Sequence, residues 1–397
     1  MFFNIYKILV FFFRVKKVWH QLQQKNILIY DEARSGSLLK YFNHRDVSIY
    51  YNRIHHSSVL NMRILIKALL LSAFSCFKNL NENYKKLYLE KIKPKFIFTF
   101  NENNLAFYKL KSICSNATTI SIQASWKDSS LLDIFYYKNF YIKKKNYLKC
   151  DYFFCYNKHV GRYLNSFIKC KYIPIGSFDS NIVKKKKNKE IDLLYVSQFR
   201  GIPDNELILK DVTFYDFIYH ENIFLINLAK YLNINNLKIV VLGSKASTAD
   251  LERKFYSKIF KNNMIKFIPK TVNRESYSIV DSANLVIGVD STMLYESFLR
   301  GNRTLFFNVR DFTKKSLKFR KFCWPAVKKL KGSFWTNESN MNEIKRLFLI
   351  KDISLNSWKD ISNKVMDDIG IFNFNNRIFL SFMKKIKVPL KRKYLTF

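Results

Sequence analysis

A run of polar residues follows one apolar strand pattern in the C-terminal half of the chain. It reads Asp290-Ser291-Thr292, and Glu296 follows one helical turn later. Free N–H groups and the dipole at the start of a helix favour an anion such as phosphate. Because Thr292 and Glu296 are four residues apart, they share a helix face, and the carboxylate is placed to accept ribose hydroxyls. The pattern predicts a nucleotide-binding helix, although an ordinary capped helix with a solvated Glu has the same spacing.

Two other strands of the C-terminal half also end in residues suited to phosphate. Ser197, Gln198 and Arg200 follow one strand, and Gly243 and Ser244 follow the next. Arg is a bidentate partner for phosphate, and Gly lets a ligand approach the backbone because it has no Cβ. Since ligands of parallel sheets bind beyond the carboxyl ends of the strands, we expect these residues beside the predicted helix start. An Arg beside a surface turn is the alternative interpretation.

The N-terminal half carries acids and amides at its own strand ends. A carboxylate there, facing the anion site across a cleft, would act as general base towards an acceptor hydroxyl. The candidate bases are Asp31, Glu32 and Glu102, which the sequence does not rank. The candidates for the acceptor side are Asn103, Gln123 and Ser125. Taken alone, each of the three acids is more typical of a cap or a turn residue.

The composition limits what kind of protein this is. The chain has 397 residues, of which 48% are hydrophobic and 17% aromatic, so a disordered chain is excluded. With 69 Lys and Arg against 30 Asp and Glu, the formal net charge is +39. Such an excess predicts an anionic partner, either a phosphorylated substrate, an acidic membrane surface or nucleic acid. The length predicts two or three domains.

Several common reaction motifs are absent from the sequence. It has no GxxxxGKS/T or GxGxxG loop, which disfavours NTPases and nicotinamide enzymes, and no GxSxG. Neither HExxH nor Asp-x-Asp occurs, and the six cysteines form no CxxC pair. We therefore expect no metal, no cofactor, and reduced thiols in a cytosolic setting.

Short apolar runs alternate with helical patterns along the chain. In the N-terminal half, strands are expected at 26–31, 47–50, 95–100, 118–123, 151–155 and 171–176, with helices from 37, at 60–91 and at 104–115. In the C-terminal half, after an opening strand near 194, strands are expected at 238–243, 265–269, 284–289 and 303–308, with helices at 248–260, 274–282 and 291–300. This alternation predicts an α/β protein with two doubly wound Rossmann-like domains facing a cleft. The predicted units are an acceptor-side domain at 1–183, a basic linker at 184–190, a nucleotide-binding domain at 191–350, and C-terminal helices with a basic tail at 351–397.

Both ends of the chain combine basic and aromatic residues. The apolar run at the start is too short to span a bilayer, because Lys7 interrupts it and Arg14 stops it. At helical spacing Lys7, Arg14 and Lys17 share a face, so 1–20 is a possible membrane-interface helix, with a first core helix as the alternative. Together with the similar end after Arg377, this predicts a cytoplasmic protein that is peripheral at the anionic inner face of the cytoplasmic membrane.

Several segments together resemble a known family. They are 92–108, 119–123, 174–178, 194–200 and 290–301. In this order they are similar to bacterial surface carbohydrate biosynthesis proteins with a glycosyltransferase B-like fold. The resemblance implies a nucleotide-sugar donor touching Ser291, Thr292 and Glu296, with the acceptor over the N-terminal domain. The chain departs from the family at Ala124-Ser125-Trp126, where members often have His-Gly or Asn-Gly.

The leading hypothesis is a metal-independent glycosyltransferase of surface polysaccharide biosynthesis, such as that of lipopolysaccharide or capsule. It would move a sugar from a nucleotide-activated donor to a cell-surface glycan or a lipid-linked acceptor. A CMP-linked donor is attractive because a single leaving phosphate needs no divalent metal. One alternative is a CDP-polyol phosphotransferase, as in teichoic-acid-type polymerases; others are a non-catalytic member of the fold and a basic nucleic-acid-binding protein. No RRM, KH or zinc motif supports the last of these.

Overall fold

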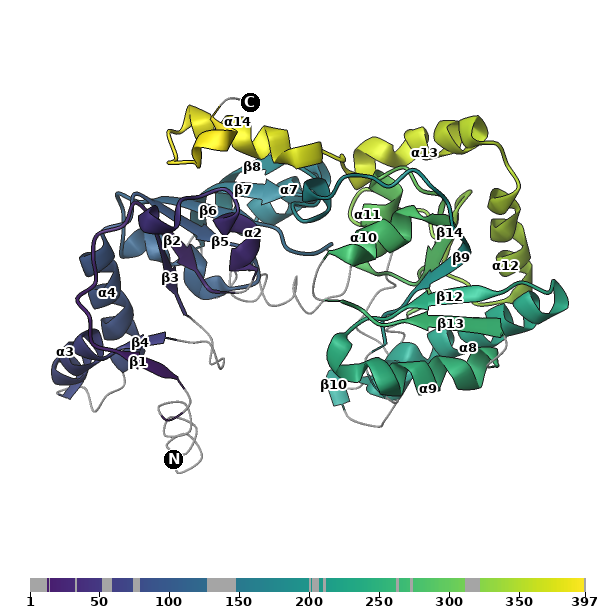
Figure 1. The fold of residues 1–397 in the computed structure, drawn as a ribbon, viewed down its shortest axis with the longest axis horizontal. Coiled ribbons are helices and arrows are strands. Elements are labelled where there is room, and N and C mark those ends of the chain that lie inside the picture. The colour runs from purple at the N-terminus through teal and green to yellow at the C-terminus, as the bar shows by residue number, and fades with distance from the viewer. Residues whose placement is uncertain are drawn as a thin grey trace.

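Two α/β lobes make up the protein, one for each half of the chain (Figure 1). The structure, a computed structural model, describes residues 13, 15–32, 34–51, 59–73, 79–126, 148–199, 201, 207–209, 212–261, 264–271, 274–310 and 322–395. Each lobe is built on a parallel sheet of six strands, and helices lie on both faces of each sheet. The predicted fold class, two doubly wound Rossmann-like domains, is confirmed.

The N-terminal lobe holds the first of these sheets. Its strands, in sheet order, are β3 (Val47–Tyr50), β2 (Ile27–Tyr30), β5 (Phe96–Thr99), β6 (Thr118–Ile122), β7 (Lys149–Cys155) and β8 (Lys169–Pro174). Its helices are α2 (Ser35–Leu39), α3 (Met62–Ser72), α4 (Leu80–Ile92), α5 (Leu105–Tyr108) and α7 (Lys158–Asn165). Two short parallel strands, β1 (Lys16–Val18) and β4 (Val59–Asn61), pair with each other beside this sheet. Ile29 packs into one apolar cluster and Leu28 into another, so both sheet faces are covered.

The C-terminal lobe holds the second sheet. Its strands, in sheet order, are β13 (Ile265–Ile268), β12 (Ile239–Leu242), β9 (Ile191–Val196), β14 (Ala283–Gly288), β15 (Thr304–Phe307) and β16 (Trp335–Thr336), and a separate antiparallel pair is formed by β10 (Leu207–Leu209) and β11 (Val212–Thr213). Its helices are α8 (Phe214–Ile234), α9 (Ala249–Phe260), α10 (Glu275–Asp281), α11 (Thr292–Leu299), α12 (Met341–Phe348) and α13 (Leu355–Ile369), and α14 (Arg377–Lys385) follows them.

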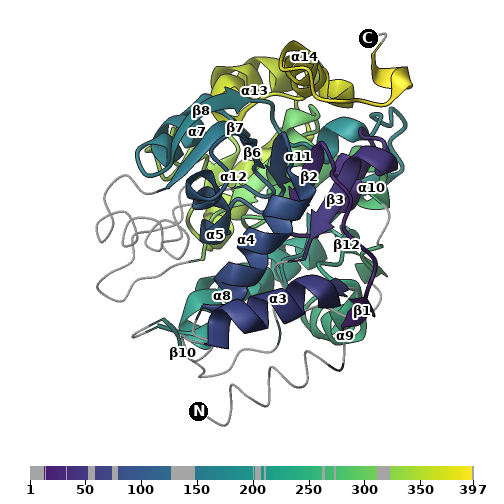
Figure 2. The same ribbon diagram turned by 90° about the vertical axis from the view of Figure 1, so that its left-hand side faces the viewer.

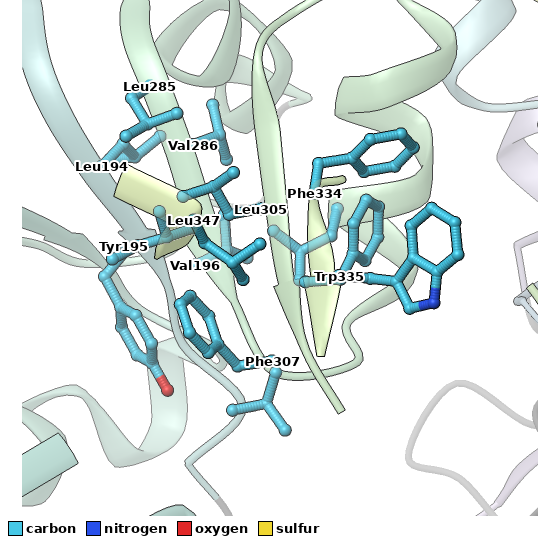
Figure 3. Packing of buried hydrophobic residues seen from close by; sticks show 14 of the residues in the cluster. Leu194, Tyr195, Val196, Leu285, Val286, Leu305, Phe307, Phe334, Trp335 and Leu347 are labelled. Carbon is cyan, nitrogen blue, oxygen red and sulfur yellow. The ribbon is translucent and has the colours of Figure 1, made fainter. Parts of the chain in front are cut away.

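The central strands of the second sheet carry apolar side chains on both faces. Leu194, Val286 and Leu305 are fully buried. Figure 3 shows these side chains packed with Phe307 and Leu347 in the core of the lobe. A parallel sheet covered on both faces needs strands that are apolar throughout, which explains why short continuous apolar runs predicted these strands correctly.

The last helix returns to the lobe in which the chain begins (Figures 1 and 2). Phe379 and Met383 of α14 are buried against the N-terminal sheet, whereas α13 packs on the C-terminal lobe. Asn376 anchors the return because its side-chain amide donates a hydrogen bond of 3.0 Å to the Tyr41 hydroxyl. The predicted unit at 351–397 is therefore divided between the lobes. Phe379 and Met383 of the basic and aromatic C-terminal end lie in a core.

Other segments also differ from the sequence-based expectation. The single helix expected at 60–91 is β4, α3 and α4, because Asn61 ends the strand and its side chain caps α3 by accepting the N–H of Ile64 at 3.2 Å. Within the expected helix 1–20, Lys16–Val18 form a strand, while residues 1–12 and 14 lie outside the described residues. The long helix α8 has no counterpart among the predicted elements.

The segment at 184–190, predicted to be an exposed linker, contains no regular element. It is nevertheless tied to the C-terminal lobe, because the Lys189 ammonium donates hydrogen bonds to the carbonyls of Asp281, at 2.8 Å, and Ala283, at 2.7 Å. Among the described helices, none combines the length and the apolar character that crossing a membrane requires.

Candidate active site

The strand order of each sheet reverses at one point, and the predicted site residues follow the strands on either side of it. In the C-terminal sheet this point lies between β9 and β14, and in the N-terminal sheet between β2 and β5. Ligands of doubly wound sheets bind outside the carboxyl ends of the strands at such switch points. The segments that follow these strands are 197–198, 290–292, 31–32 and 101–104. The structure therefore gathers the candidates into two groups, one in each lobe.

Two acids lie buried at the switch point of the N-terminal lobe. Asp31 is 0% exposed, and its Oδ2 accepts a hydrogen bond of 2.9 Å from the Asn101 side chain, which joins the ends of β2 and β5. Its backbone φ of +88° is rare for a residue other than Gly. Glu102 is 1% exposed, and its Oε2 accepts the N–H of Ala124 at 2.9 Å. Glu32, the third candidate base, is only partly buried.

The predicted acceptor-side residues do not act as a group. Asn103 is exposed and Ser125 is partly buried. Gln123 is 2% exposed. Its side-chain amide donates to the Ser125 carbonyl at 2.8 Å and accepts the N–H of Tyr156 at 3.0 Å. Gln123 therefore holds the ends of β6 and β7 together and does not present its amide to an acceptor.

A buried Arg, which sequence reasoning missed, organises the switch point of the C-terminal lobe. Arg310 is 1% exposed and donates to the side chain of Gln198 and, at 3.0 Å, to its carbonyl. It also pairs with Asp290 at 3.3 Å and with Glu221 of α8 at 2.5 Å. Because Gln198 follows β9 and Asp290 follows β14, Arg310 holds the two loops that flank the switch point. Arg310 lies just after the last predicted strand, but no local pattern marks its partners.

The loop after β12 does not offer its N–H groups to a phosphate. The N–H of Ser244 donates to the Glu252 carboxylate at 2.9 Å, and the Ser244 hydroxyl donates to the Phe199 carbonyl at 3.0 Å. A Cβ on Gly243 would lie 3.0 Å from the Phe267 ring, so packing alone accounts for this Gly. The expectation that Gly243 and Ser244 bind phosphate is not supported here, because Glu252 of α9 already occupies the loop.

Of the three residues predicted after β9, Gln198 is bound by Arg310. Ser197 is buried and shares a hydrogen bond of 2.8 Å with the Tyr256 hydroxyl of α9. Arg200 lies outside the described residues. None of the described side chains in this segment is therefore an open phosphate ligand.

The start of α11 contacts the N-terminal lobe directly. The Ser291 side chain caps this helix by accepting the N–H of Met293 at 3.3 Å. The Thr292 hydroxyl accepts the N–H of Trp126 at 3.1 Å, and the Trp126 ring stacks on Tyr295 with centroids 3.9 Å apart. Trp126 belongs to the segment in which the chain departs from the family pattern. The departure therefore places an aromatic ring against the predicted nucleotide helix.

The predicted ribose ligand, Glu296, is buried at the same boundary between the lobes. It is 5% exposed, and its Oε1 accepts hydrogen bonds from the Tyr156 hydroxyl at 3.0 Å and from the Ser177 hydroxyl. Both hydroxyls come from the N-terminal lobe. Burial raises the pKa of Glu296, while these hydrogen bonds act to lower it. In this conformation protein hydroxyls occupy the acceptor positions that a ribose would use.

We expect Glu296→Gln to stabilise the protein at neutral pH, because burial raises the pKa of Glu296 and makes its ionised form unfavourable in the folded state. The ordinary pKa near 4.5 is raised on folding, so the folded state binds the proton more tightly than the unfolded state. The wild-type protein therefore loses stability as the pH rises from 4.5 through the raised pKa, and a neutral Gln does not.

Urea unfolding of both proteins between about pH 4 and 8 checks this expectation, because the difference should shrink towards low pH. Glu190→Gln, at a side chain that is 60% exposed, is the control without such a pH dependence. Parallel pH profiles for wild type and Glu296→Gln would contradict the burial argument.

A family model described as "putative O-antigen biosynthesis protein" matches residues 120–387. No curated protein matches the chain.

Solved structures share the two-lobed fold at low sequence identity. HepE from Anabaena, in complex with UDP and glucose, is 12% identical with a TM-score of 0.50, and the match covers 92% of this chain and 99% of that one. A variant of the wall teichoic acid polymerase TagF is 12% identical with a TM-score of 0.50, covering 92% and 89%. A "putative UDP-N-acetylglucosamine 2-epimerase" from Listeria monocytogenes is 11% identical with a TM-score of 0.52, covering 92% and 97%. At these identities the likeness shows the fold alone.

Proposed function

The chain belongs to a family of O-antigen biosynthesis proteins, and from that premise we propose that it is a glycosyltransferase of surface polysaccharide biosynthesis. It moves a sugar from a nucleotide-activated donor to a glycan or lipid-linked acceptor. The donor binds to the C-terminal lobe and the acceptor lies over the N-terminal lobe. HepE, which has the same fold, is described in complex with UDP and glucose, which supports a nucleotide-sugar donor.

One observation carries the proposal: the loop after β6, beside the switch point of the N-terminal lobe, contacts the switch point of the C-terminal lobe. Thr292, at the start of the predicted donor helix, accepts the backbone N–H of Trp126, and Trp126 follows directly on the acceptor-side strand end. The backbone of that strand end is in turn held by Glu102, through the N–H of Ala124. A donor at one switch point and an acceptor at the other would therefore be neighbours. Such proximity is what group transfer needs.

The proposed reaction is a displacement at the anomeric carbon of the donor sugar. Glu102 removes the proton from the acceptor hydroxyl, and the oxygen forms a bond to the anomeric carbon as the bond to the nucleotide phosphate breaks. The positive end of the α11 dipole stabilises the charge that develops on the leaving phosphate. Among the candidate bases Glu102 is preferred, because it holds the N–H of Ala124 in the loop that reaches the start of α11 through Trp126, whereas Asp31 is bound to Asn101 within its own lobe.

The donor and its setting can be proposed more finely. A CMP-linked sugar fits a reaction without a metal, since one leaving phosphate carries less charge than two. The net charge of +39 favours an anionic or lipid-linked acceptor at the inner face of the cytoplasmic membrane. Co-sedimentation with phosphatidylglycerol vesicles at low salt tests this placement, and a protein that stays in the supernatant argues against it.

The test of the function is a thermal-shift panel of CMP, CDP, UDP, GDP and dTDP, each with and without EDTA. A ligand that binds only the folded state raises the melting temperature by mass action. Among nucleotides of equal charge, we expect one base to raise the melting temperature more than the others. EDTA should not change this difference. Equal shifts by all diphosphates would indicate non-specific anion binding to a basic protein and would refute the proposal. A selective response to CDP alone would favour a CDP-polyol phosphotransferase instead.

A further inference from the structure

Two arginines, one from each lobe, converge on a single carboxylate at the boundary between the lobes. Arg34 follows β2 of the N-terminal lobe, and Arg274 precedes α10 of the C-terminal lobe. Their Nη atoms lie 3.5 Å and 3.0 Å from the two carboxylate oxygens of Asp179, which follows β8. The Ser37 hydroxyl donates to Asp179 at 2.6 Å and accepts from Arg274 at 2.7 Å. The cluster therefore contains two positive charges and one negative charge.

The two arginine side chains of this cluster are partly exposed, and their hydrogen-bond donors are incompletely used. The side chains of Arg34 and Arg274 are 47% and 38% exposed, whereas that of Asp179 is 18% exposed. A guanidinium has five N–H donors. Within the described part of the chain, Arg34 donates only through Nη1, to Asp179 and to the Ala124 carbonyl, and Arg274 donates only through Nη2. Both side chains therefore keep donors for a further acceptor.

The surroundings of the cluster are also positively charged. Burial and the nearby charges of Arg274 and Lys393 lower the pKa of Lys40, which follows α2. Arg34 in turn interacts electrostatically with Glu102 and with Glu296. Arg34 is thus within electrostatic reach of both the proposed general base and the proposed donor helix, where it could attract an anionic part of a substrate.

We propose that Arg34 and Arg274 form a phosphate clamp that spans the two lobes, in which Asp179 occupies the phosphate position while no substrate is bound. Guanidinium groups bind carboxylates and phosphates with the same two-pronged geometry, so a phosphate can take the place of the carboxylate. Only the source of the phosphate rests on the proposed function. That source is either the donor nucleotide or a phosphorylated lipid acceptor.

The clamp and a purely structural ion pair predict opposite effects of Asp179→Asn. If Asp179 competes with phosphate, its neutralisation should tighten the binding of inorganic pyrophosphate, by up to roughly fivefold. Arg34→Gln and Arg274→Gln should each weaken it by about tenfold. Arg253→Gln, which removes a 55%-exposed Arg elsewhere on the C-terminal lobe, is the control and should change nothing. Calorimetric titration at constant ionic strength measures all five proteins.

Unchanged or weaker pyrophosphate binding in Asp179→Asn, together with wild-type binding in the two Arg variants, would overturn the clamp. Two further titrations distinguish the sources of the phosphate. Weaker binding of CMP, but not of farnesyl phosphate, in the Arg variants assigns the clamp to the donor, and the reverse assigns it to the acceptor.

The clamp and the glycosyltransferase proposal can also fail separately. Arg-dependent pyrophosphate binding without any nucleotide selectivity keeps the clamp and refutes the transferase. Selective nucleotide binding that is unchanged in both Arg variants refutes the clamp and supports the transferase.

Discussion

Arg310→Met is expected to lower the free energy of unfolding by about 3–5 kcal/mol, the usual cost of removing one partner from a buried ion pair. Met keeps a side chain of similar length but removes the guanidinium. Glu221 and Asp290 are 5% and 6% exposed, so water cannot replace the lost partner without a rearrangement. The loss of charge pairing, rather than a cavity, therefore dominates the expected effect.

The same substitution should also loosen the switch point of the C-terminal lobe. Arg310 is bound to Gln198 after β9 and to Asp290 after β14, so both flanking loops lose their common anchor. We expect nucleotide affinity to fall even at temperatures where the variant remains folded. This second readout separates an anchoring role at the site from a general loss of stability.

Urea unfolding followed by circular dichroism measures the stability change. The control is Arg253→Met, because Arg253 pairs with Asp250 at 4.0 Å and the two side chains are 55% and 89% exposed. Exposed pairs contribute about 0–1 kcal/mol, so the control should change little. In the double variant Arg310→Met/Glu221→Gln, the loss should be smaller than the sum of the two single losses. Equal effects of Arg310→Met and Arg253→Met would contradict the buried-anchor interpretation.

Glu102→Gln is expected to reduce sugar transfer by about 10²–10⁴-fold, the usual contribution of a general base. Gln cannot take the proton from the acceptor hydroxyl. Its side-chain oxygen can still accept the N–H of Ala124, which Glu102 accepts at 2.9 Å, so the loop that leads to Trp126 should keep its position. The variant should therefore fold and bind nucleotide like the wild type.

The measurement is restoration of surface polysaccharide in cells that lack the protein, combined with the nucleotide dissociation constant of the purified variant. Glu90→Gln is the control, because Glu90 is an exposed acid on α4 of the same lobe. Full restoration by Glu102→Gln would remove Glu102 as the base and leave Asp31 and Glu32 as candidates. A weakened nucleotide affinity would instead show that Glu102 acts by holding the loop.

Most strands and several helices of both lobes were predictable, because periodicity is a local property. The strands at 26–31, 95–100 and 284–289 are largely apolar runs, as a parallel sheet buried on both faces requires. Helix α8 had a usable signal that was missed: Thr213 and Asp216 form a capping box at its start. At Lys16–Val18 the tertiary pairing of β1 with β4 replaced the helix expected there.

The position of the site was predictable for a similar reason. In a parallel sheet all carboxyl strand ends lie at one edge, so polar residues directly after the strands had to gather there. This is why Asp31, Glu102, Asp290 and Thr292 were found without knowledge of the fold. Which of them remain open to a ligand was not predictable, because that depends on what packs against each one.

The sequence by itself therefore determined the fold class, the family and the strand ends that carry the site. Only the tertiary structure decided the partners: Arg310 meets Gln198 across 112 residues, Ser177 meets Glu296 across 119, and Asn376 meets Tyr41 across 335. Secondary structure follows from patterns repeated within a few residues, and these patterns can be recognised in a single sequence. The partners of buried charges and hydroxyls are determined only when the two lobes are folded and packed against each other. Burial makes an unpaired polar group energetically costly, so each buried group must pair with a group that the fold brings near it.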